Sequence, residues 1–112
     1  MKLFLRARSV EVPEPLAKDI ERRLRVVLSR FGRKISHVTI RFSDVNGERG
    51  GVDKLCRVEA RVWGRLPLAA EGLSDDLRTA AVCAVDRIGR VVERALAKRF
   101  TTPRDFPFRT LA

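Results

Sequence analysis

The chain has 112 residues, a length that suits a single domain. Its 24 Lys and Arg outnumber its 14 Asp and Glu, and the net charge of +10 favours a polyanionic partner, either nucleic acid or an anionic membrane surface. Two cysteines and one histidine exclude a disulfide framework and any ordinary zinc site, and no segment is typical of a secretory signal or a membrane-spanning helix. We therefore expect a cytoplasmic protein without a metal or other cofactor.

The first third of the chain predicts a strand followed by a helix. Apolar and charged side chains alternate in 2–12, which is the period of a β-strand with one buried face. Pro13 and Pro15 end that strand and suit the start of a helix. The segment 14–33 then has an apolar stripe at helical spacing, and Gly32 marks its expected end. The stripe consists of Leu16, Ile20, Leu24, Val27, Leu28 and Phe31.

The middle of the chain predicts three further strands. Every second residue is apolar in 36–43 and again in 54–63. Between them, 44–53 is a polar, glycine-rich connector of the hairpin type. A short turn then leads into a weaker strand over 66–71. Because these connections are short, we expect the three strands to pair as an antiparallel meander.

A second amphipathic helix is predicted over 75–99. Ser74 is its expected N-cap. Asp75 and Asp76 follow in the first turn, where the helix dipole favours negative charge.

The predicted order of elements is β-α-β-β-β-α. Each strand has one apolar face and each helix has one apolar stripe, so the economical arrangement packs both helices on one face of a four-stranded sheet. This is an α+β fold whose other sheet face is open to solvent. We expect it to span 1–100 and to be followed by a C-terminal tail, 101–112, which has two prolines and no clear period.

Basic side chains gather on the outer surfaces of both predicted helices. At 100° per residue they lie opposite the apolar stripes or beside them. Like charges at these spacings repel, so two such rows are better explained by an anionic ligand than by a solvated helix surface. Two helices packed side by side would present the rows as one basic surface. The residues expected to bind nucleic acid are Lys18, Arg22, Arg25, Arg33, Arg87, Arg90, Arg94 and Lys98.

The open sheet face is a second candidate for nucleic-acid binding. A sheet that recognises RNA stacks bases on aromatic side chains, and here only Phe4 and, at a strand end, Trp63 are available. We expect Trp63 to pack against the sheet edge instead. The arginines on this face are Arg6, Arg8, Arg41, Arg57 and Arg61.

The connector 44–53 offers two weak resemblances to catalytic or metal-binding loops. Its acidic start is similar to a calcium loop, but Leu55 stands where that loop requires Glu. Gly50 and Gly51 are similar to the GGQ loop of peptidyl-tRNA hydrolysing factors, but Val52 replaces the Gln. We expect a hairpin turn with neither activity.

The remaining reactive side chains give no catalytic set either. His37 has no Ser, Cys or carboxylate that the sequence places beside it, so we expect a surface residue of a strand. Cys56 and Cys83 are expected to be small packing residues. The sequence therefore predicts no enzyme and no small-molecule substrate.

The chain resembles the ribosome hibernation promoting factor family, also called the ribosome-associated inhibitor A, Protein Y or sigma-54 modulation protein family. The resemblance covers about 2–99 and rests on the segments VEVPEPLAKDIERRLRVVLSRF, HVTIRFSDVNG and DKLCRVEARV. The most specific segment is EGLSDDLRTAAVCAVDRIGRVVERALAKR, in which 81–87 matches an AID-A-DR type helix. With no room for the dimerisation domain of long members, the chain is similar to the short form.

The resemblance implies a fold similar to double-stranded RNA-binding domains. It also implies binding to the small ribosomal subunit, in the channel between head and body, where the mRNA and the tRNAs would otherwise lie. The basic residues of both helices would contact rRNA, and a monomer would sterically inhibit translation on idle ribosomes without touching a membrane. The alternative is a transcription modulator that binds a sigma factor through protein–protein contacts.

Overall fold

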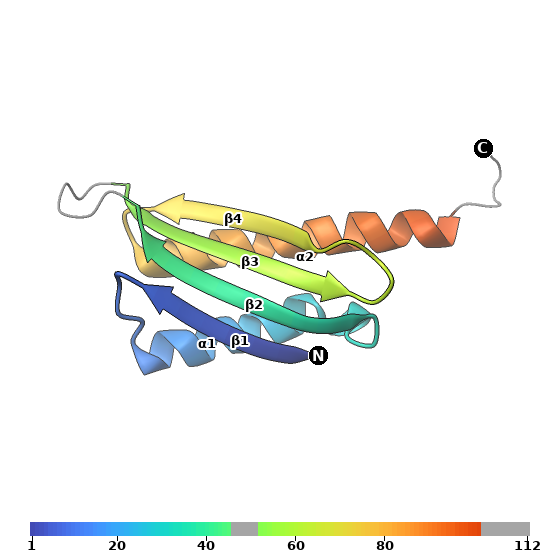
Figure 1. Ribbon diagram of the computed structural model, residues 1–112, viewed down its shortest axis with the longest axis horizontal. Helices are drawn as coiled ribbons and strands as arrows, with labels where there is room; N and C mark the ends of the chain where they lie inside the picture. The colour runs from blue at the N-terminus through green and yellow to red at the C-terminus, as the bar shows by residue number, and fades with distance from the viewer. Residues whose placement is uncertain (46–51, 102–112) are drawn as a thin grey trace.

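A computed structural model of the chain describes residues 1–45 and 52–101, with side chains as far as Leu96. The observed elements follow the predicted β-α-β-β-β-α order, with a short 3₁₀ helix, η1, after the first α-helix (Figure 1). Their bounds are β1 Lys2–Arg8, α1 Glu14–Val27, η1 Ser29–Phe31, β2 Ile35–Asp44, β3 Lys54–Val62, β4 Leu68–Ser74 and α2 Leu77–Thr101. No helix within these ranges is long and apolar enough to span a lipid bilayer.

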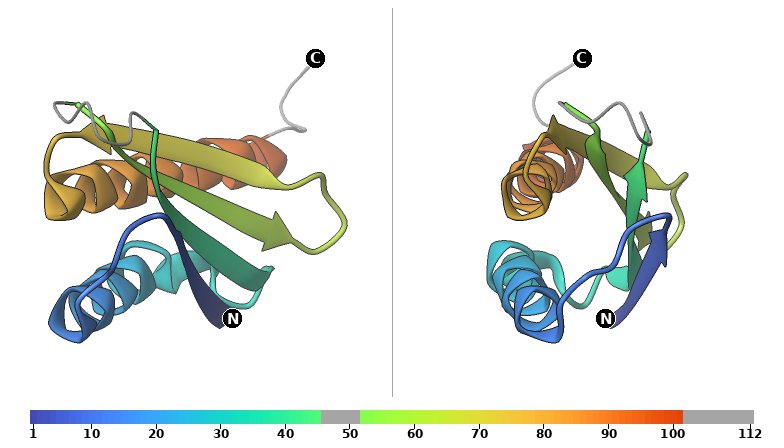
Figure 2. Two further views of the ribbon diagram at one scale, coloured as in Figure 1. Left: turned by 60° about the vertical axis from the view of Figure 1, so that its left-hand side comes forward. Right: turned by 90° about the vertical axis from the view of Figure 1, so that its left-hand side faces the viewer.

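The four strands form one mixed sheet in the order β1-β2-β3-β4. β1 pairs in parallel with β2, and α1 is the crossover that such a parallel pair requires. β2, β3 and β4 pair antiparallel, which confirms the predicted meander. Both helices cover the same face of the sheet (Figure 2). The predicted α+β architecture is therefore confirmed.

The core lies between the sheet and the two helices. The alternation in β2 buries Val38, Ile40 and Phe42, and the helical period in α1 buries Ile20 and Leu24. Cys56 of β3 is fully buried, and this burial raises the pKa of its thiol to about 12. Such a thiol is protonated at neutral pH, so the expected packing role of Cys56 is confirmed.

Two predicted boundaries in the first third of the chain are wrong. β1 ends at Arg8 because Ser9 adopts a left-handed conformation, with φ of 64°, and turns the chain out of the sheet. α1 ends at Val27 rather than near 33. There the Ser29 hydroxyl donates to the Val26 carbonyl, and the chain tightens into η1.

Gly32 does not end α1. It caps η1 in a right-handed conformation with φ of −55°, so the left-handed glycine of an ordinary C-terminal cap is not used here.

The boundaries of the last strand and helix are displaced toward the C-terminus. β4 covers Leu68–Ser74 instead of 66–71, because its register with β3 extends to the pair of Ser74 and Lys54. Since Ser74 belongs to the sheet, α2 begins at Leu77 rather than at 75. Thr101 is the last residue of α2, and the rest of the predicted tail, 102–112, lies outside the described residues.

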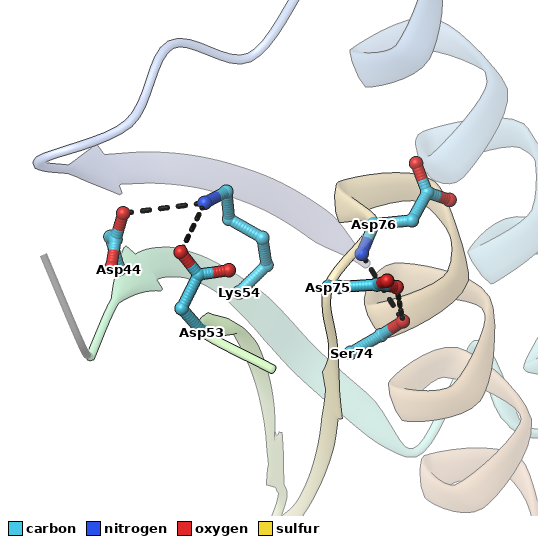
Figure 3. A network of polar contacts seen from close by, with 6 residues as sticks. All are labelled: Asp44, Asp53, Lys54, Ser74, Asp75 and Asp76. Carbon is cyan, nitrogen blue, oxygen red and sulfur yellow. Dashed lines mark hydrogen bonds and ion pairs between the residues drawn. The ribbon is translucent and has the colours of Figure 1, made fainter. Parts of the chain in front are cut away.

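Asp76, and not Ser74, caps α2. Its carboxylate accepts hydrogen bonds from the Thr79 hydroxyl at 2.8 Å and from the Thr79 backbone N–H at 2.9 Å. These bonds hold the pKa of Asp76 below its ordinary value. Ser74 supports the turn from outside, because its hydroxyl oxygen accepts a hydrogen bond from the Asp76 N–H at 3.2 Å (Figure 3).

Gly72 brings β4 and α2 close together. A Cβ atom at this position would overlap the backbone of Ala80 and Ala84 in the helix. All three residues are buried. The absence of a side chain therefore sets how α2 lies beside the edge of the sheet, and with it the position of the basic residues on that helix.

Candidate nucleic-acid interface

The basic residues predicted on α1 fall into two groups. Lys18 and Arg22 form exposed ion pairs with acids of their own helix, at 3.3 Å to Glu14 and 3.4 Å to Asp19. Arg25 of α1 and Arg33, which follows η1, are exposed and have no ion pair or hydrogen bond in the described part of the chain. Both line one hollow at the end of the molecule where β2 begins.

Three of the predicted basic residues of α2, Arg87, Arg90 and Arg94, lie along the flank that faces the edge strand β4. The Arg87 guanidinium donates a hydrogen bond of 2.8 Å to the Glu71 carbonyl oxygen of β4. Arg90 and Arg94 are exposed and unpaired within the described residues. With Arg87 and with Arg57 of β3, they line a hollow of about 500 Å³ between the helix and the strand.

Lys98 also belongs to α2, but its side chain lies outside the description. The predicted set is therefore placed for seven of its eight side chains.

Three ion pairs cross the seam between the two helices. The Arg23 guanidinium contacts both carboxylate oxygens of Asp86 at 3.2 Å. Arg30 and Glu93 lie 3.2 Å apart, and Arg78 of α2 pairs with Asp19 of α1 at 3.3 Å. We call these residues the seam. Its acids lie between the two basic rows, so the single basic surface expected from the sequence is divided in two.

The unpaired arginines are the part of this surface that is free to bind an anion. We call Arg25, Arg33, Arg90 and Arg94 the free row. Each presents a planar fork of N–H donors that matches a phosphate group. The positive charge of a seam arginine is already partly neutralised by a carboxylate, whereas a residue of the free row has no acid among the described residues to compete with a phosphate.

The open face of the sheet holds the second candidate cluster. The register aligns Arg6, Arg41 and Arg57 across β1, β2 and β3, and Glu71 of β4 completes the row. Glu71 pairs with Arg57 at 3.1 Å. Phe4 lies on this face in edge contact with His37, at 5.9 Å between ring centroids. The face is therefore basic, with one exposed aromatic ring in place of a stacking platform.

His37 is a half-buried strand residue, and the expectation that no Ser lies beside it is wrong, because its Nδ1 lies 3.2 Å from the hydroxyl of the adjacent Ser36. Within the described ranges, no three His, Cys, Asp or Glu side chains come together in a way that could hold a metal ion.

At the base of the connector 44–53, Lys54 pairs with Asp53 at 2.8 Å and with Asp44 at 3.3 Å (Figure 3). The hydrogen bond to Asp53 raises the pKa of Lys54 above its ordinary value. The residues of the connector on which the calcium-loop and GGQ resemblances depend, 46–51, lie outside the described part of the chain.

Trp63 departs from its predicted position. Its side chain is 65% exposed, so it does not pack against the sheet edge. It lies in the turn between β3 and β4 and lines the same hollow as Arg25 and Arg33. Sequence reasoning missed this because the three residues are close only in the folded chain. A glycine directly after the aromatic residue was the available signal, since it indicates a turn rather than a continuing strand.

Known proteins resemble this chain in structure. A ribosomal subunit interface protein from Coxiella burnetii matches with a TM-score of 0.63 and 20% identity, over 91% of this chain and 100% of its own. The N-terminal domain of Protein Y from Thermus thermophilus matches with a TM-score of 0.64 and 19% identity, over 85% of this chain and 99% of its own. The chain shares their fold. No family model and no curated protein matches its sequence.

The similarity extends over essentially the whole of both solved chains. At 20% and 19% identity, it shows a shared fold.

Proposed function

We propose that this protein is a short member of the ribosome hibernation promoting factor family. It binds rRNA of the small ribosomal subunit through the outer flanks of α1 and α2, in the channel used by mRNA and tRNA, and blocks translation in idle bacterial ribosomes under stress. The fold it shares with a ribosomal subunit interface protein and with Protein Y supports this partner. A ribosomal partner also places the protein in the cytoplasm.

The free row carries the proposal. The four arginines of the free row are exposed and have no acidic partner among the described residues, whereas Arg22, Arg23 and Arg30 of the same helical surface are ion-paired. Leaving them unpaired keeps a large positive charge on the folded protein, which opposes compaction. Phosphates of rRNA offset that repulsion on binding and release their condensed counterions.

The other predicted residues can bind phosphate with little loss of folding free energy. Lys18 and Arg22 hold exposed ion pairs, and such pairs contribute about 0–1 kcal/mol, so they exchange readily for a phosphate. Arg87 keeps donors beyond the one that bonds to Glu71. Lys98 of α2 completes the set as a contact predicted from the sequence.

The mechanism is occupation of the channel by a monomer, with no chemical step. Inhibition of translation therefore follows the ratio of protein to ribosomes and reaches completion near equivalence. In a translation assay with a known ribosome concentration, we expect a stoichiometric titration. Complete inhibition by a small fraction of an equivalent would mean turnover and would overturn this mechanism.

The interface is tested with two variants that remove the same charge from opposite faces. Arg90→Gln with Arg94→Gln removes two members of the free row, and Arg6→Gln with Arg41→Gln removes two sheet arginines. Co-sedimentation with purified ribosomes over a range of salt concentrations gives affinity and salt slope. The helix variant should bind more weakly, with a slope of log K against log salt lower by about one to two.

The sheet variant should keep the affinity and most of the slope of the native protein. Loss of ribosomes by the sheet variant alone would place the RNA on the other face. A partner that is a protein, as in the sigma-factor alternative, would show up as binding that survives salt sufficient to release rRNA.

A further inference from the structure

Trp63 is the least buried large aromatic residue in the described part of the chain, and hydrogen bonds anchor the turn that carries it. Its backbone N–H donates to the Lys34 carbonyl at 2.9 Å, which ties the turn to the segment before β2. The Arg65 guanidinium donates to the Ala95 carbonyl at 2.8 Å, which ties the other side of the turn to α2. The indole is thus displayed on a support fixed at two points.

The turn itself exposes the ring. The Arg65 N–H closes it onto the Val62 carbonyl at 3.2 Å, and Gly64 takes the left-handed conformation with φ of 73°. A glycine with positive φ in the third position is the requirement of a type II turn. Trp63 therefore occupies the second position, with its strand neighbour Val62 buried and its own side chain 65% exposed.

The neighbours of the indole are cationic. Arg25 and Arg33 line the same hollow, of about 600 Å³, and neither has an acidic partner among the described residues. Among the described residues, no Asp or Glu lines this hollow. A flat aromatic face beside two free guanidinium groups matches a nucleotide, whose base stacks while its flanking phosphates are bound.

We propose that Trp63 stacks on an unpaired base of an RNA strand whose phosphates Arg25 and Arg33 contact. This rests on the proposed function, because it places a base at the edge of the rRNA interface, and it adds a contact that phosphate binding alone does not supply. Leu66, 84% exposed in the same connection, would also suit an apolar protein partner. The positive charge of the hollow favours RNA over that occupant.

The single tryptophan of the chain makes the contact directly measurable. A short oligoadenylate is titrated into the protein while indole emission is followed, and its affinity is measured separately by the anisotropy of a labelled copy. An abasic oligonucleotide of equal length supplies the phosphates alone. We expect oligoadenylate to quench Trp63, and the abasic strand to bind more weakly with little quenching.

Three variants assign the effect to the ring. Trp63→Leu should weaken oligoadenylate binding by about tenfold, since stacking one base on an aromatic ring is typically worth that much. Trp63→Phe should lose less than about threefold, because it keeps an aromatic face. Leu66→Ala, the matched apolar control, should change nothing. All variants should bind the abasic strand equally.

Equal affinity of native protein and Trp63→Leu for oligoadenylate, or an unquenched indole in the complex, would overturn the inference. A loss of binding in Leu66→Ala comparable to that in Trp63→Leu would point instead to a general apolar surface. The proposed function has a separate test. It is contradicted if substitutions in the free row leave ribosome binding unchanged, whatever the result with oligoadenylate. If ribosome binding depends on the free row but no base stacks on Trp63, the proposed function holds and only the contact to Trp63 is wrong.

Discussion

The seam and the free row both contain arginines. The arginines of the seam form ion pairs between the two helices, whereas those of the free row have no ion pair with another described residue. In the seam, Arg23 is 45% exposed and contacts Asp86 through a two-oxygen pair that joins α2 to α1. In the free row, Arg90 lies one turn further along α2 than Asp86 and has no acidic partner in the described part of the chain. A count of basic residues cannot separate the two roles. The ion pairs of the folded chain distinguish them. We therefore expect the same substitution to have different consequences in the two regions.

The largest expected effect is charge reversal in the free row. Arg90→Glu with Arg94→Glu should weaken ribosome binding by about a hundredfold or more, because two charged contacts are replaced by repulsion from phosphate. The free energy of unfolding should change by less than about 0.5 kcal/mol, since neither side chain has an ion pair or hydrogen bond with another described residue. Co-sedimentation and urea denaturation measure the two quantities.

The same reversal in the seam, Arg23→Glu with Arg30→Glu, is the control. It places like charges against Asp86 and Glu93 and should lower stability. If it left stability intact and abolished ribosome binding, the distinction between the two regions would be wrong.

Gly72→Ala should displace α2, and with it Arg90 and Arg94 of the free row, without changing any charged residue. Gly72→Ala overfills the contact between β4 and the α2 backbone, and such overpacking costs about 1–3 kcal/mol of unfolding free energy. Chemical denaturation measures it. Gly32→Ala adds the same methyl group where its nearest atom is 3.7 Å away, and it should cost less than about 0.5 kcal/mol. Equal stability of the two variants would contradict the close approach of helix and strand.

Removing the seam acids should convert paired arginines into free ones. Asp86→Asn with Glu93→Gln releases Arg23 and Arg30 and raises the net charge by two. Ribosome affinity should rise, and the salt slope should steepen by about one to two. Stability should fall by up to about 2 kcal/mol, because two exposed pairs are lost. Unchanged affinity at every salt concentration would show that RNA does not reach the seam.

The smallest effect concerns the cap that starts α2. Because the folded-state pKa of Asp76 is lowered, its charge stabilises the fold above the ordinary aspartate range, and this contribution is lost as the pH falls below about 4. Asp76→Asn keeps a capping side chain without the charge. Thermal unfolding should therefore show a smaller acid-induced loss for this variant than for the native chain. If the unfolding temperatures of the variant and the native chain fell equally on acidification, the charge of Asp76 would make no such contribution.

The periodic parts of this fold could be read from the sequence, and the parts set by distant contacts could not. The alternation in β2 and the stripe in α1 correctly gave the buried residues Ile40 and Leu24, since local period determines which face is apolar. The end of β4 could not be found locally. Ser74, Asp75 and Asp76 are all good capping residues, and the pairing of Ser74 with β3 decides among them.

The candidate site shows the same limit. The basic positions on each helix follow from helical period alone, but their partners do not. Arg23 and Asp86 are 63 residues apart in the sequence and meet only because α1 and α2 pack side by side. The exposure of Trp63 likewise depends on a turn held by Lys34 and Ala95. Which charges remain free is thus a property of the tertiary structure.

The order of the strands has a consequence for the unbound protein. β1 and β4 are the two edges of the sheet, and an edge with unpaired backbone groups invites strands of other copies to add to it. β1 carries exposed Arg6 and Arg8, which repel an incoming identical strand. On β4, the Arg87 guanidinium already occupies the Glu71 carbonyl oxygen. The arginines at these two edges therefore also oppose edge-to-edge association of the sheets of separate copies.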